Sequence, residues 1–332
     1  MQTHKTILAS AVVLLPHLLA CQVVAETTSA AVQSKPDVLR LGNPAGDREL
    51  IRDNQFRSGF LLLDPTPGKR VPYGRIPGPE GNPIWDLAQW SSKFPLTAGS
   101  GRHRSPQAIY QFNQAKAISF GGRSKTAFDL SMAVNASQEY GQRSRRKGEP
   151  WVHLLVQQDF DAPPFLVDLK SARLHIEVRL AKSRRTKTED YTPSLHAAQF
   201  QMFLTVQNRN RQSPGYGKYL WFGIPLYDDR SRFPKAHKSR DFGGTGMFIF
   251  TPGGETYSSV SAHDREWITV DEDLLPLMRE ALETAWSRGF LQESKAMADY
   301  CIGGMNLGWE VPGIFDVELQ VRNLSLKVTG LK

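Results

Sequence analysis

Apolar and polar residues alternate with a period of two along most of the chain beyond residue 108, and turn residues separate the alternating segments. This is the pattern of half-buried β-strands. Helical segments of comparable length do not alternate with these runs, so the pattern favours an all-β fold over a parallel α/β sheet. The predicted strands are residues 117–120, 127–133, 151–160, 174–181, 199–207, 219–227, 246–250, 266–270 and 315–328.

One segment, residues 271–290, has a helical period instead. Asp271 or Thr269 is placed to cap its start, and Gly289 is placed to close its end. Its apolar residues fall on one side of a helix and are Leu274, Met278, Ala281, Leu282 and Ala285. Many strands with a single helix predict a two-sheet antiparallel jelly-roll sandwich with one peripheral α-helix.

The segment 64–83 is rich in proline and glycine, so it predicts an extended loop over a surface and neither a helix nor a central strand. Residues 84–96 contain Trp85 and Trp90, and we expect them at a sheet edge.

The N-terminus has the pattern of an export signal. Lys5 precedes an apolar run from Ile7 to Ala20, and Val23 and Ala25 are small residues in the positions that a signal peptidase reads. The pattern predicts a signal peptide over residues 1–25, a flexible leader over 26–35 and a single β-sandwich domain over 36–332. An alternative is a lipid anchor on Cys21, which ends the sequence LLAC.

Export predicts a secreted or periplasmic protein. The apolar run is short for a membrane span, and the rest of the chain has no segment apolar enough to be one, so we expect no transmembrane helix. The other cysteine is Cys301, which we expect to be a small buried apolar residue and not a nucleophile.

The chain is basic, with 41 Lys and Arg against 33 Asp and Glu and a formal net charge of +8. The excess gathers in residues 141–149, 181–187, 207–212 and 229–240, which we expect to be loops. Gathered at one rim they would attract anionic partners; the alternative is that they are solvated loops. Because an exported protein rarely meets nucleic acid, we expect no nucleic-acid partner despite the basic charge.

The second face of the predicted strands is unusual for a solvated sheet, because it is rich in Gln, His, Arg, Trp and Tyr. Such side chains combine flat apolar area with hydrogen-bonding groups, which sugar recognition requires. They predict a concave oligosaccharide groove, in which Gly223 leaves room for a ligand. The predicted substrate-binding residues are Gln199, Gln201, Tyr219, Trp221, Tyr227, Gln320 and Arg322. The alternative is that the Pro-rich segment and the helix cover this face.

Two catalytic schemes fit the groove, and the residues that we expect to carry them are His153, His175, Glu177, Arg179 and Glu318. A polysaccharide lyase needs Arg or Gln to neutralise a uronate carboxylate, and His or Tyr to move a proton. A glycoside hydrolase needs two carboxylates, for which Glu177 and Glu318 are the candidate pair. Glu310 is placed within reach of the groove end.

The strand pattern over residues 108–328 resembles that of exported jelly-roll carbohydrate-active proteins of the concanavalin-A-like kind. The sequence HIEVRLAK, residues 175–182, resembles the Arg-x-Glu-x-Arg strand of jelly-roll alginate lyases at Glu177 and Arg179, with His175 in the first position. Their Gln-x-His element is absent, as is the Glu-x-Asp-x-x-Glu element of jelly-roll endoglucanases. The resemblance implies a polysaccharide ligand, bound with or without cleavage.

Metal and cofactor signals are few. The histidines lack the paired spacing of a zinc site. Asp228 and Asp229 suggest either a structural calcium site or a turn with ion pairs to Arg230. The sequence therefore predicts a cofactor-free protein that binds an anionic polysaccharide. The alternative is a non-catalytic envelope-associated protein that docks another protein on the same face.

Overall fold

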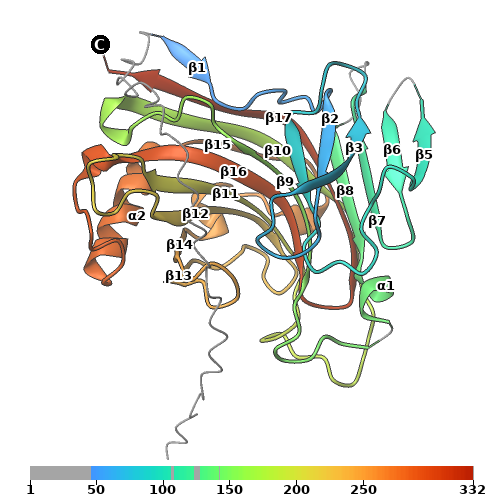
Figure 1. The fold of residues 1–332 in the computed structure, drawn as a ribbon. Coiled ribbons are helices and arrows are strands. Elements are labelled where there is room, and N and C mark those ends of the chain that lie inside the picture. Colours follow the sequence, from blue (N-terminus) through green and yellow to red (C-terminus); the bar gives the residue numbers. More distant parts are fainter. Residues whose placement is uncertain (1–45, 106–107, 123–127, 142, 332) are drawn as a thin grey trace, which may run out of the picture. The chain divides into compact units, whose positions relative to one another are not determined.

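The computed structural model has two β-sheets packed face to face, and it describes residues 46–105, 108–122, 128–141 and 143–331 (Figure 1). By their contacts, residues Gly42–Lys332 form one unit. The predicted signal peptide, the leader and Cys21 lie outside the described residues.

Sheet A has eight strands, and all of its pairs are antiparallel. Its order is β15 (Ile268–Asp273), β10 (Leu169–Arg185), β17 (Phe315–Gly330), β8 (Leu130–Asn135), β7 (Lys116–Phe120), β6 (Ile109–Phe112) and β5 (Gly101–Arg104), with β1 (Asp47–Glu49) paired to β17.

Sheet B has nine strands and two parallel pairs, β12 with β14 and β2 with β4. Its order is β13 (His237–Arg240), β14 (Phe248–Thr251), β12 (Tyr219–Asp228), β11 (Gln199–Asn208), β16 (Tyr300–Val311), β9 (Val152–Asp159), β4 (Trp85–Ala88), β2 (Gly59–Leu63) and β3 (Pro72–Pro77). The two sheets confirm the predicted jelly-roll sandwich.

The core lies between the sheets and is built from the apolar positions of the period-two pattern. In β10 and β11, for example, Leu174, Ile176, Phe200 and Met202 are fully buried. Trp309 of β16 is also buried, and its Nε1 donates to the Met132 carbonyl of β8 at 2.9 Å. This bond ties one sheet to the other through the core.

The predicted helix is α2 (Leu275–Ser287), which packs on β10, β12 and β14. It begins later than expected, because residues 271–273 finish β15. Thr269 and Asp271 lie within β15, and the N-cap residue is Leu274, which has no side-chain cap bond, so neither predicted cap is correct. The Asp273 carboxylate, just before the cap, accepts from the amides of Leu275 (3.1 Å) and Ala172 (2.8 Å). The other helices are α1 (Ala136–Tyr140) and 3-10 turns at Leu166–Asp168, Gly254–Thr256, Ala262–Asp264 and Met297–Asp299.

Several strands were not predicted. β16 lies in the middle of sheet B, although Gly303, Gly304 and Gly308 interrupt its alternation. The segment expected to be an extended loop contains edge strand β3, and β4 lies inside sheet B and not at an edge. β2, β5, β6 and β13 were also missed.

Candidate functional site

The residues predicted to line one groove lie on the outer faces of two different sheets. On β10 and β17 of sheet A are His175, Glu177, Arg179, Glu318, Gln320 and Arg322. On β9, β11 and β12 of sheet B are His153, Gln199, Gln201, Tyr219 and Trp221. Outer faces of a sandwich point away from each other, so the prediction of a single trough is wrong. Strand parity identifies the polar face of a strand but not the sheet that the strand joins.

Tyr227 lies on neither outer face. It is 2% exposed, its ring packs on Trp309 in the core, and its hydroxyl is 3.0 Å from Ser183 Oγ. The cause is a register shift between β11 and β12, where Phe200 pairs with Tyr227 but Gln201 pairs with Pro225. The extra residue of this bulge reverses the alternation, so the assignment of Tyr227 to a binding surface is wrong.

The polar side chains on the outer face of sheet A bind one another. Glu177 accepts from Arg322 Nε and Asn323 Nδ2, each at 2.7 Å. Burial would raise the pKa of Glu177, but these hydrogen bonds outweigh it and lower the pKa. Arg179 donates to Gln320 Oε1 at 2.6 Å, and the guanidinium groups of Arg179 and Arg322 lie 4.9 and 4.1 Å from the Trp267 ring centroid.

Glu177 and Glu318 are too far apart for a hydrolase pair. Glu177 faces Arg322, which is four positions along β17 from Glu318. At about 3.3 Å per residue this offset is roughly 13 Å, whereas the two carboxyl groups of a glycosidase lie about 5–9.5 Å apart. In addition, Glu318 accepts from Ser131 Oγ at 2.7 Å. The register therefore argues against this catalytic pair.

The outer face of sheet B has an aromatic cluster of Phe203, Tyr219 and Trp221. Trp221 meets the other two rings edge to face, at centroid distances of 5.9 Å to Phe203 and 5.1 Å to Tyr219. All three side chains are half-buried. The cross-strand register brings amides to the same face, because Gln207 pairs with Tyr219 and Phe203 pairs with Asn306. The face thus combines rings with hydrogen-bonding groups.

Gly223 does not leave room for a ligand as predicted. A Cβ atom at this position would lie 2.2 Å from Thr251 Oγ1 and 2.8 Å from Phe203 Cε1. The side chains of two neighbouring strands fill that space, so the glycine serves packing within the face.

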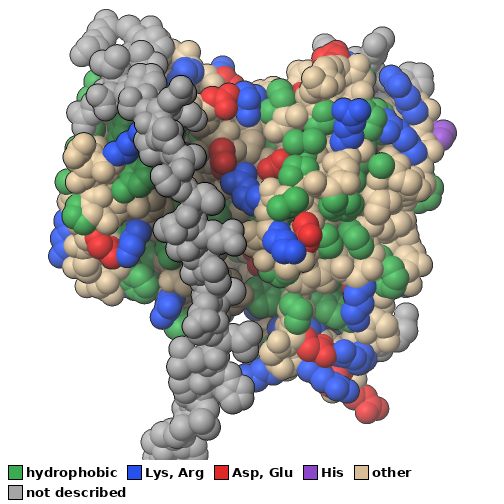
Figure 2. Space-filling view, viewed as in Figure 1, with side chains coloured by type: hydrophobic (Ala, Val, Ile, Leu, Met, Phe, Trp, Pro, Cys, Tyr) green, Lys and Arg blue, Asp and Glu red, His purple; other side chains and the backbone are tan. Residues whose placement is uncertain are grey.

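Part of the outer face of sheet B is covered. Trp90 packs on Leu63, Ala88 and Leu155, which form a small second apolar cluster over β2, β4 and β9. Beside it, Arg70 from the Pro-rich segment binds Asp159 at 3.0 Å and Asp86 at 3.4 Å. The predicted alternative, a face covered by the Pro-rich segment and the helix, is met only by this contact of Arg70, whose side chain is still 49% exposed. Figure 2 shows a hollow on the side where β2, β3, β13 and β14 lie in Figure 1, with acidic and basic side chains adjoining within it.

His153 and Glu310 form an acid–base pair at one end of the same face. They are opposite each other on β9 and β16, with His153 Nε2 3.7 Å from Glu310 Oε2. The imidazole lies between the rings of Trp90 (5.6 Å) and Trp151 (5.8 Å). Burial lowers the pKa of His153 against the opposing effect of the Glu310 carboxylate, which favours a neutral ring.

The basic segments expected to be loops are partly strands and partly ion-paired. Residues 181–185 belong to β10 and 237–240 to β13. Arg184 binds Asp316 at 2.7 Å and Arg232 binds Asp264 at 2.6 Å. Arg145 is almost fully buried and donates to four main-chain carbonyls. Neighbouring carboxylates thus offset part of this positive charge.

The carboxylate of Asp228 is bound by Arg230, whose Nε and Nη2 donate to its two oxygens at 2.8 and 2.6 Å. This is the ion pair named as the alternative to calcium. Across the described ranges, no group of three or more His, Cys, Asp or Glu side chains is placed to hold a metal ion. Within the same residues, no helix has the length and apolarity needed to cross a membrane.

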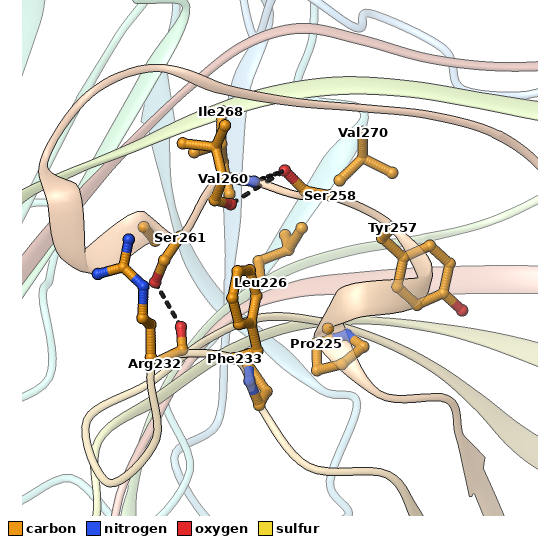
Figure 3. Close-up of a pocket in the computed structure, with 13 residues that line it drawn as sticks. Pro225, Leu226, Arg232, Phe233, Tyr257, Ser258, Val260, Ser261, Ile268 and Val270 are labelled. Atoms are coloured by element: carbon orange, nitrogen blue, oxygen red, sulfur yellow. Dashed lines mark hydrogen bonds between the residues drawn. The ribbon is translucent and has the colours of Figure 1, made fainter.

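A small apolar pocket lies between the end of β12 and β15 (Figure 3). Leu226, Ile268, Val270 and Tyr257 contribute to its walls. Its hydroxyls are already bonded within the chain, since Ser258 Oγ donates to the Val260 carbonyl at 3.0 Å and Ser261 Oγ donates to the Arg232 carbonyl. We therefore assign it to packing of the sandwich end.

No family model matches the chain, and no curated protein matches it. Its fold is similar to that of solved polysaccharide-degrading enzymes. A cellulase derived from Rhodothermus marinus Cel12A is 12% identical, with a TM-score of 0.36 over 74% of this chain and 100% of that one. The family 11 xylanase from Neocallimastix patriciarum is 10% identical, with a TM-score of 0.34 over 74% and 100%. The family 12 xyloglucanase from Bacillus licheniformis is 9% identical, with a TM-score of 0.38 over 73% and 99%. At such identities and TM-scores, the similarity says nothing about the activity of this chain.

Proposed function

We propose that the chain binds a polysaccharide on the outer face of sheet B. The observation that supports this most is the aromatic cluster of Phe203, Tyr219 and Trp221, which shares its face with side-chain amides. An aromatic ring suits the C–H face of a sugar, and amides suit its hydroxyl groups. Gln199 and Gln201 lie on the same face and are half-buried, as a partly recessed binding surface requires.

Binding without cleavage is the form of this proposal that the side-chain contacts favour. The strands of this face carry four carboxylates within the described residues, and three of them are already bound by arginine, namely Asp86, Asp159 and Asp228. The fourth, Glu310, adjoins His153. If the chain cleaves its ligand, this pair is where a proton would be transferred. His175, Glu177, Arg179 and Glu318 lie on the other sheet and would not contact that ligand.

An anionic polymer is the preferred ligand in this proposal, with the net charge of +8 as its support. On the binding face itself, Arg70 is matched by Asp86 and Asp159. Any preference for anions therefore depends on the charge of the whole chain.

Export is also part of the proposal. It rests on the apolar run and the small residues of the N-terminus, and the lipid anchor at Cys21 stays its alternative. A structural calcium ion likewise stays a sequence prediction.

Affinity electrophoresis tests the binding. The full chain is run through gels cast with alginate, polygalacturonate, carboxymethylcellulose, xyloglucan or dextran sulfate. We expect at least one polymer to retard the wild type, and Trp221→Ala to weaken its affinity by about tenfold, or ~1.4 kcal/mol. The matched control is Phe112→Ala, which removes an exposed ring from the outer face of sheet A.

The outcomes separate the candidate functions. Equal retardation of wild type and Trp221→Ala would reject the aromatic cluster as the binding surface. No retardation by any polymer would favour a protein-docking role. Release of unsaturated or reducing products from a bound polymer, lost in Glu310→Gln, would show cleavage.

A further inference from the structure

In the loop between β13 and β14, residues 241–247, three hydrogen bonds converge on one carboxylate. Asp241 accepts from the amides of Gly243 (3.2 Å) and Thr245 (2.7 Å) and from Thr245 Oγ1 (2.8 Å). We call this segment the crossing loop. Phe242, next to the tip, is 85% exposed, so the loop does not bury an apolar anchor of its own.

The crossing loop touches both ends of the candidate binding face. Thr245 Oγ1 accepts from Trp221 Nε1 at 3.0 Å, which places the loop beside the aromatic cluster. Gly243 lies against Trp151, where an added Cβ atom would be 2.2 Å from Cη2 of the indole. Trp151 directly precedes β9, and three strands (β12, β11 and β16) lie between β14 and β9. The loop and Trp151 therefore meet across these strands.

Trp151 forms the fixed side of this contact. Its Nε1 donates to Glu310 Oε2 at 3.1 Å, which holds the indole over the outer face of β16. The guanidinium of Arg145 lies 5.5 Å from the ring centroid, and Arg145 is itself held by the carbonyls of Pro312, Glu149 and Leu195. The loop contacts the aromatic cluster through Thr245, whose Oγ1 accepts from Trp221 Nε1.

We propose that the crossing loop and Trp151 close over a bound glycan and make the site selective for unbranched chains. This inference rests on the proposed function. The backbone of Gly243 lies directly against the Trp151 indole, with no space for even a Cβ atom between them. A glycan that passes between Gly243 and Trp151 therefore has to displace the loop. A branch on that glycan needs a larger displacement than a linear backbone does. Gly243 and Trp151 are in this way the specificity-determining residues.

Two measurements on the full chain test this. The first compares affinity for hydroxyethylcellulose, an uncharged linear chain without sugar branches, with affinity for xyloglucan, which is also uncharged and has the same backbone with sugar side branches. We expect the wild type to bind the linear polymer at least tenfold more tightly. Trp151→Ala should reduce this ratio to less than threefold by admitting the branched polymer. The matched control is Trp267→Ala, on the outer face of sheet A, which should keep the wild-type ratio.

The second measurement needs no ligand. In hydrogen exchange, the Thr245 amide should exchange at least tenfold faster in Trp151→Ala than in the wild type, and Gly243→Ala should have the same effect. Unchanged exchange in both variants, or an unchanged polymer ratio in Trp151→Ala, would overturn the inference and leave polysaccharide binding intact. If the wild type binds neither polymer, the inference is overturned for glucan chains. The affinity gels with the other polymers then show whether the proposed polysaccharide binding fails as well.

Discussion

Asp229 is a carboxyl group whose ionisation the fold opposes. Burial raises its pKa to about 6, although the Ala198 amide donates to Oδ1 at 2.6 Å. In an unfolded chain the pKa is about 3.9. The Asp229 carboxyl group therefore binds its proton more tightly in the folded state than in the unfolded state. The protonated group stabilises the fold fully below about pH 4, and this stabilisation is lost as the pH rises through 6.

We expect Asp229→Asn to remove this pH dependence, because an amide keeps the bond from Ala198 without a charge. The full shift corresponds to ~3 kcal/mol, and partial exposure reduces the effect to about 1 kcal/mol. Thermal unfolding should thus show equal stability for wild type and variant at pH 4 and a more stable variant at pH 8. The exposed-site control is Asp161→Asn, and a constant difference at both pH values would contradict the assignment.

Some features at the residue scale follow from the sequence and others do not. Cys301 is buried as predicted, and burial raises the pKa of its thiol to about 12. Tyr227 was misplaced because a one-residue bulge leaves no mark in the hydrophobic pattern. The buried ion pair of Lys116 and Glu139 was missed for a similar reason, since lysine in a strand looks like a solvent-facing position.

At the scale of elements, long strands with clean alternation were found, whereas the glycine-interrupted β16 and the short strands β2, β5, β6 and β13 were not. β10, β11, β12 and β17 all overlap their predicted ranges. β16 was missed because glycine has no side chain to contribute to the pattern. In the structure these glycines have steric roles, since a Cβ atom on Gly308 would lie 2.1 Å from the Leu154 carbonyl oxygen of β9.

We therefore expect Gly308→Ala to destabilise the protein. Gly308 has φ +152°, which side-chain-bearing residues rarely adopt, and its partner across the ladder is backbone that cannot move freely. Strain and the clash together should lower the free energy of unfolding by about 2–4 kcal/mol, measured by urea denaturation. Gly253→Ala is the control, because its Cβ atom would have no neighbour closer than 3.7 Å. Equal losses in both variants would refute the steric explanation.

At the scale of the whole molecule, the sequence predicted the architecture but not the neighbours of each strand. β10 and β17 belong to one sheet and β11 and β12 to the other, although all four alternate in the same way. Pairing depends on contacts between distant segments, which a local pattern does not record. For this reason the residues predicted to form one site lie on two surfaces, one on each sheet, and only the surface of sheet B carries the aromatic cluster.

The charge of the whole chain gives a further test. If the net charge of +8 draws an anionic polymer to the face, the affinity for that polymer should fall by at least tenfold between 50 and 300 mM NaCl, because salt screens exposed charges. Affinity for an uncharged polymer such as xyloglucan should change less than twofold. Salt-independent binding of alginate or polygalacturonate would show that rings and amides, and not charge, select the ligand.

The terminal strands of both sheets have residues that discourage self-association. Unpaired strand edges invite a second copy to add its own strand, and charge or proline on the edge opposes this. Here the two ends of sheet A are acidic β15 and basic β5, and those of sheet B are basic β13 and the proline-bounded β3. The residues concerned are Asp271, Glu272 and Asp273; Arg102 and Arg104; Lys238 and Arg240; and Pro72 and Pro77. Lys238 and Arg240, part of the charge that first suggested an anionic ligand, thus oppose the addition of a second copy's strand at the β13 edge.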